Sequence, residues 1–135
     1  MADNKAFKLK VYQPTRTFYD GEADMVELTT SEGEVGIYAG HIPVTSIVSP
    51  GVLRIHNGGE VKEASLLDGF IKIGGDEVVV ISEACEWPEE IDVHRAEEAR
   101  IRAERRIKGG GMGVDMNRAE VALKKSLVRL GLARK

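Results

Sequence analysis

Glycine-containing turn signals divide the first two thirds of the chain into short, strand-like runs. These signals lie at residues 20–21, 50–51, 57–59, 68–69 and 74–76. The first run, at 7–11, alternates apolar and polar residues, as expected of a strand with one buried face. No helical period is present before residue 91. This spacing predicts an N-terminal antiparallel β-sandwich or flattened barrel.

Three further runs, at 25–29, 52–55 and 70–73, are equally short and rich in strand-forming residues. Residues 78–81 are all apolar, which predicts a strand buried on both faces. The segment 31–43 interrupts the pattern with glycines, a proline, two acids and a histidine. It is predicted to be a loop.

The last third of the chain predicts a C-terminal antiparallel αα-hairpin. Two helical patterns are separated by a glycine-rich joint at 109–113. Their apolar stripes contain many small residues: Ala96, Ala99, Ala103 and Ile107 on the first, and Met116, Ala119, Leu123, Leu127 and Leu130 on the second. Such stripes bury little area, so their packing is worth only about a few kcal/mol. We therefore expect a sandwich domain at 1–87 and a hairpin at 88–135 that can open, with Trp87 at the junction as a fluorescent reporter of docking.

The two parts carry opposite charge. Residues 1–90 contain 7 Lys and Arg against 16 Asp and Glu, a net charge of −9, whereas residues 91–135 contain 12 against 6, a net charge of +6. A cationic hairpin can bind its own acidic domain, an acidic partner or phosphate. A nucleic-acid-binding adaptor is disfavoured, because the hairpin has no aromatic residue for base stacking.

Other site classes find little support in the sequence. A single cysteine, Cys85, excludes an intramolecular disulfide and is interpreted as a packing residue. The histidines are too scattered to indicate a metal site, and the tri-glycine lacks the Lys-Ser or Lys-Thr of a phosphate loop. No apolar run reaches the roughly 18 residues of a membrane span, so a cytoplasmic protein is expected.

The predicted loop carries a family resemblance. Ser31-Glu32-Gly33-Glu34-Val35-Gly36-Ile37-Tyr38-Ala39-Gly40-His41-Ile42-Pro43, followed by Pro50-Gly51-Val52-Leu53-Arg54-Ile55, resembles the epsilon subunit of bacterial F-type, proton-translocating ATP synthases. The resemblance implies a ten-stranded sandwich in the central stalk that docks on the gamma subunit and the c-subunit ring. It also implies that Glu34 and His41 face the c ring.

In that family the hairpin inhibits ATP hydrolysis. The resemblance implies a compact hairpin in one state, and in the other an extended hairpin whose basic residues meet the beta subunit. It implies a non-catalytic subunit that is peripheral to the cytoplasmic side of the cell membrane and bound there only through the complex. If all 45 residues of 91–135 were helical, they would reach about 65 Å at 1.5 Å per residue.

The hairpin opens with Ile91-Asp92-Val93-His94-Arg95-Ala96, which resembles the nucleotide-binding signature of bacillus-like members that bind ATP. By position, the resemblance implies this regulatory shell: Glu86, Ile91, Asp92, Arg95, Ala96, Arg102, Lys125 and Arg129. In this interpretation the carboxylate accepts from the adenine amine, Ile91 packs on the ring and the cations bind phosphate. Lys125 departs from the arginine of such relatives and loses the bidentate fork.

Two alternatives remain open from the residues. Asp92 can cap the first helix and pair with Arg95 while the other cations form a solvated face. The hairpin can also be an inhibitor that is insensitive to nucleotide. If ATP does bind, with or without magnesium, it is expected to be a signal that stabilises the compact hairpin by RT ln(1 + [L]/Kd).

Overall fold

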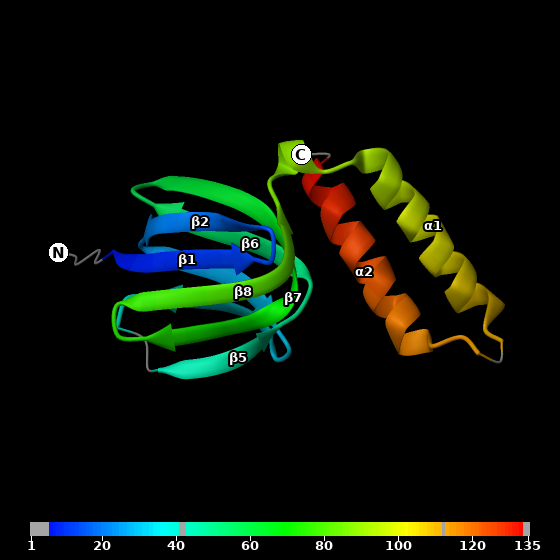
Figure 1. Ribbon diagram of the computed structural model, residues 1–135, viewed down its shortest axis with the longest axis horizontal. Coiled ribbons are helices and arrows are strands. Elements are labelled where there is room, and N and C mark those ends of the chain that lie inside the picture. Colours follow the sequence, from blue (N-terminus) through cyan, green and yellow to red (C-terminus); the bar gives the residue numbers. More distant parts are fainter. Residues whose placement is uncertain (1–5, 41–42, 112, 134–135) are drawn as a thin grey trace.

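The computed structural model describes residues 6–40, 43–111 and 113–133. Figure 1 shows a two-layered β-sandwich followed by a pair of helices at one end. The strands are β1 (Phe7–Gln13), β2 (Arg16–Ala23), β3 (Met25–Thr30), β4 (Gly33–Tyr38), β5 (Val44–Val48), β6 (Gly51–Asn57), β7 (Glu60–Gly74) and β8 (Glu77–Glu86). A short 3-10 helix η1 (Pro88–Glu90), then α1 (Val93–Gly109) and α2 (Met116–Ala133), complete the order. The predicted sandwich and hairpin are confirmed.

Among the strands that the structure describes, all pairings but one are antiparallel. β1 pairs with β2 antiparallel and with β8 parallel, Val11 lying opposite Val80. Parallel pairing is possible here because β1 and β8 are far apart in sequence and need no tight turn between them. The long strand β7 pairs with β6 along its first half and with β5 along its second. β7 therefore belongs to both layers of the sandwich.

The turn predicted at residues 68–69 is wrong, because β7 continues through it as a bend. Asp68 has a φ of 39° and Gly69 a φ of 151°. A Cβ atom on Gly69 would lie 2.0 Å from the carbonyl oxygen of Ile81 on β8, so the chains meet too closely for any side chain. The described residues form eight strands, whereas the family resemblance implied ten. One reason is that long strands such as β7 run through positions where a turn was predicted.

The loop predicted at 31–43 is also wrong in part, because β4 occupies Gly33–Tyr38. Within the described ranges, β4 is an edge strand that pairs with β3 and with no other strand. Of its residues, Ile37 alone is buried. An edge strand needs no regular alternation of apolar residues, so its sequence lacked the signal of a strand.

The core lies between the two layers of strands. The predicted burial of residues 78–81 on both faces is wrong: Val78 and Val80 are buried, but Val79 is half-buried and Ile81 is 41% exposed. Burial raises the pKa of the Cys85 thiol to about 11, so this side chain is an unreactive packing residue. The core includes Phe7, Leu9, Val11, Val26, Leu28, Ile37, Leu53, Ile55, Leu66, Ile71 and Val80.

The hairpin packs through small residues, and α2 lies between α1 and the sandwich (Figure 1). Ala96, Ala103 and Ala119 are buried, as is Ser126, which the predicted stripe omitted. The prediction that Leu127 packs is wrong, since its side chain is 50% exposed. Neither helix is long and apolar enough to cross a membrane, within the residues that the structure describes.

Candidate functional site

A depression of about 320 Å³ lies where the hairpin meets the end of the sandwich. Its lining comes from β8, from both helices and from the residue that precedes α1. It includes six of the eight residues of the predicted nucleotide shell. It also includes Ala99, which was not part of that shell but follows Ala96 on the same helical stripe. The lining is Glu86, Asp92, Arg95, Ala96, Ala99, Arg102 and Arg129.

Asp92 occupies the N-cap position of α1. Its Oδ1 accepts a hydrogen bond from the backbone N–H of Arg95 at 3.0 Å. This cap satisfies one of the free N–H groups in the first turn. The carboxylate still has a second oxygen with which to accept a hydrogen bond from a ligand. Capping the helix and binding a ligand are thus compatible roles for Asp92.

Three guanidinium groups meet at the depression. Arg129 Nε lies 2.7 Å from Glu86 Oε1, which links α2 to β8. In the described parts of the chain, Arg95 and Arg102 make no ion pair, whereas Arg100 on another face of α1 pairs with Glu104 at 2.6 Å. Three guanidinium groups against the two carboxylates of Glu86 and Asp92 leave the lining of the depression with a net positive charge, which favours an anion.

Two predicted members of the shell lie elsewhere. Ile91 is only 8% exposed and does not line the depression. Lys125 Nζ lies 2.6 Å from Asp68 Oδ2 on β7, so its charge is directed to the sandwich. Neither side chain therefore faces the depression in this arrangement.

The junction before the hairpin is clamped to the sandwich by a residue that sequence patterns did not indicate. The Arg16 guanidinium donates to both carboxylate oxygens of Glu90, at 2.8 and 2.7 Å. These bonds hold the pKa of the Glu90 carboxyl below its ordinary value. Trp87 stacks on Phe18 with ring centroids 4.3 Å apart. These contacts bind Trp87 and η1 to the sandwich in the docked arrangement.

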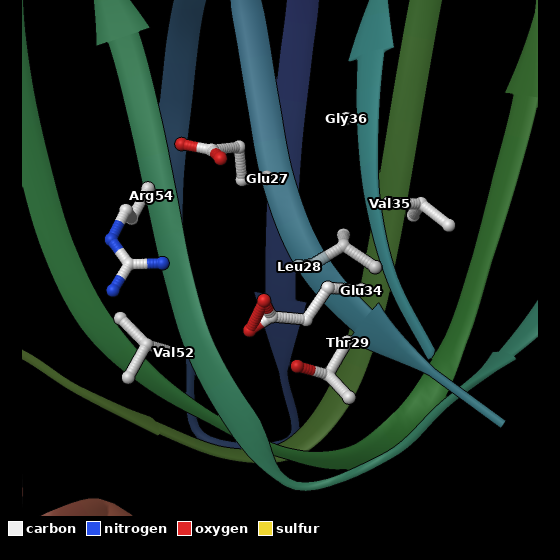
Figure 2. A pocket seen from close by; sticks show the side chains of 8 residues that line it. All are labelled: Glu27, Leu28, Thr29, Glu34, Val35, Gly36, Val52 and Arg54. Carbon is white, nitrogen blue, oxygen red and sulfur yellow. The ribbon is translucent and has the colours of Figure 1, made fainter. Parts of the chain in front are cut away.

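The residues implied for the c ring are described only in part. Glu34 is exposed on β4, at a shallow hollow of about 140 Å³ between β3, β4 and β6. Figure 2 shows its carboxylate over the same hollow as Thr29 and Arg54. Arg54 is itself bound to Glu63, with Nε 2.9 Å from Oε2. His41 lies outside the described residues.

Two family models match consecutive parts of the chain. Residues 6–88 match the β-sandwich domain of the ATP synthase Delta/Epsilon chain, and residues 89–134 match its long α-helix domain. A mitochondrial ATP synthase structure from Euglena gracilis, comprising OSCP, F1 and c-ring, contains a chain of the same fold. The TM-score is 0.79 at 22% identity, covering 94% of this chain and 80% of that one.

Bacterial relatives are similar in sequence to this chain over nearly its whole length. The ATP synthase epsilon chain of Caldanaerobacter subterraneus subsp. tengcongensis is 41% identical over 133 residues, covering 98% of this chain and 96% of the relative. That of Alkaliphilus metalliredigens is 44% identical, with coverages of 95% and 96%. That of Bacillus cytotoxicus is 36% identical, with coverages of 96% and 97%. The chain therefore belongs to the family of ATP synthase epsilon chains, which are non-catalytic subunits of that complex.

Proposed function

We propose that this epsilon chain works in the central stalk of an F-type ATP synthase as a nucleotide-controlled brake on ATP hydrolysis. Figure 1 shows the hairpin beside one end of its own sandwich. In this docked state the proposed brake is off. In the released state the hairpin extends toward the beta subunit and inhibits. The observation that carries the proposal is the convergence of Asp92, Arg95, Arg102 and Arg129 on one depression.

The chemistry of the depression fits adenosine triphosphate. The Asp92 carboxylate can accept from the exocyclic amine of adenine, and the small side chains of Ala96 and Ala99 leave room beside it. Guanidinium groups bind phosphate oxygens in pairs, and Arg95 and Arg102 have no carboxylate partner in the described structure to give up. ATP, free or with magnesium, is therefore proposed as a regulatory ligand and not as a substrate.

The free energy that ATP binding can supply is of the same size as the free energy of packing between the two helices. A ligand that binds only the docked hairpin stabilises it by about 2.7 kcal/mol at a hundredfold excess over Kd. The contact between α1 and α2 is built on Ala96, Ala103 and Ala119, and burying such small side chains is worth about a few kcal/mol in total. Abundant ATP would therefore keep the hairpin docked, and scarce ATP would let it open.

An apolar row on the outside of the sandwich supports docking on the gamma subunit. Ile47, Phe70 and Ile81 are paired across β5, β7 and β8. Their side chains are 64%, 45% and 41% exposed. Neighbours in register share one face of a sheet, and exposed apolar patches of this kind mark interaction sites. Together with Glu34 toward the c ring, this row would hold the chain at the cytoplasmic side of the membrane through the complex.

ATP hydrolysis by the reconstituted complex tests the brake. The full chain is compared with a chain that ends at Glu90, whose sandwich core is formed by residues of β1 to β8 and stays complete. At low ATP concentration we expect the full chain to slow the initial hydrolysis severalfold relative to the truncated one. At high ATP concentration the difference should shrink.

The other outcomes separate the alternatives. A constant difference at every ATP concentration would indicate an inhibitory hairpin that is insensitive to nucleotide. Equal rates with both chains would show that the hairpin does not inhibit at all.

A further inference from the structure

Two ion pairs connect α2 to the sandwich. Lys125 Nζ lies 2.6 Å from Asp68 Oδ2 on β7, and one helical turn later Arg129 binds Glu86 on β8. Side chains four residues apart share one face of a helix, so Lys125 and Arg129 point toward the same side. Only Arg129 also lines the nucleotide depression. Lys125 thus has a contact of its own, away from the proposed ligand.

Asp68 is held in an unusual backbone conformation. Its φ of 39° is the only positive value among the non-glycine residues that the structure describes. The Ser82 hydroxyl lies 2.9 Å from the Asp68 carbonyl oxygen, and Gly69 fits against the backbone of β8. The bend therefore fixes the backbone position from which the Asp68 side chain extends. Asp and Asn tolerate this left-handed conformation better than other non-glycine residues do.

We propose that Asp68 and Lys125 form an electrostatic latch that adds to the stability of the docked hairpin whether or not nucleotide is bound. In this assignment Lys125 acts as a positioning residue for α2 and not as a phosphate ligand. The side chains of Lys125 and Asp68 are 28% and 36% exposed, so water and salt still reach the pair and it can open. The latch builds on the proposed function, in which the hairpin leaves the sandwich, but it operates without ATP.

Amide hydrogen exchange of the full chain without nucleotide tests the latch. Asp68→Asn removes the charge but keeps the tolerance for a positive φ, so the bend of β7 is preserved. Exchange in α2 should accelerate about threefold, because a partly exposed ion pair contributes modestly and an undocked short helix frays. Lys125→Gln should have the same effect. Lys124→Gln is the matched control, since this neighbouring lysine is exposed on α2 and should leave exchange unchanged.

Two comparisons decide the result. The double variant should exchange no faster than either single variant, since both remove one interaction. At about 1 M KCl the wild type should approach the variants as the pair is screened. Exchange in Asp68→Asn equal to the wild type, or a double variant equal to the product of the two single effects, would overturn the latch. Because no nucleotide is present, these outcomes are independent of whether ATP binds.

Discussion

Replacing Arg95 and Arg102 together by alanine is expected to weaken ATP binding to the full chain by about a hundredfold. Each guanidinium faces the depression without an ion-pair partner in the described residues, so its charge is available to phosphate. A hydrogen bond to a charged group contributes about 1.5–3 kcal/mol, roughly tenfold or more in affinity for each arginine. Isothermal titration calorimetry measures the change.

Arg105→Ala is the matched control for this prediction. Arg105 is exposed on α1 but does not line the depression, so its removal tests general attraction between the basic hairpin and an anion. Its ATP affinity should stay within about twofold of the wild type, as expected of a screened charge outside the site. If the control and the double variant lost affinity equally, the depression would not be the binding site.

Gly69→Ala should destabilise the sandwich by about 3 kcal/mol or more, or prevent folding. The added Cβ would lie 2.0 Å from the Ile81 carbonyl oxygen and 2.8 Å from the Ser82 Cα atom, both on the backbone of β8. A backbone cannot rotate away as a side chain can, and a φ of 151° is open only to glycine. Urea denaturation measures the loss.

Gly74→Ala, at the end of the same strand, provides the comparison. A Cβ at Gly74 would have no atom within 4 Å, so this variant should stay within about 0.5 kcal/mol of the wild type. Equal stability of the two variants would show that β7 and β8 do not meet closely at the bend.

The sandwich was largely predictable, because alternating apolar residues report one buried face and need no knowledge of distant partners. The bend at Asp68 and Gly69 was not, since an Asp-Gly pair signals a turn unless another strand lies against it. Here Ile81 and Ser82 of β8 provide that neighbour. The exposed edge strand β4 was missed because it buries only Ile37, which leaves no alternation of buried and exposed residues in its sequence.

The candidate site also contains residues that the sequence could locate and contacts that it could not. Asp92, Arg95 and Ala96 lie within six residues of sequence, so a local motif could locate them together. The partners of Lys125 and Arg16 could not be found, because Asp68 and Glu90 lie far away in sequence and meet them only in the folded chain. The stack of Trp87 on Phe18 could not be found for the same reason, since the two rings come from distant parts of the sequence. That Trp87 fluorescence reports docking of the hairpin stays a prediction.

Amide hydrogen exchange of the wild-type chain titrated with ATP tests the control of the hairpin most directly. The core strands β1 and β8 serve as the internal reference, because they lie outside the depression except for the end of β8. If ATP binds the docked hairpin, exchange in α1 and α2 should slow in proportion to 1 + [L]/Kd while exchange in the reference strands stays constant. If exchange in both helices is unchanged at millimolar ATP, ATP does not control docking of the hairpin.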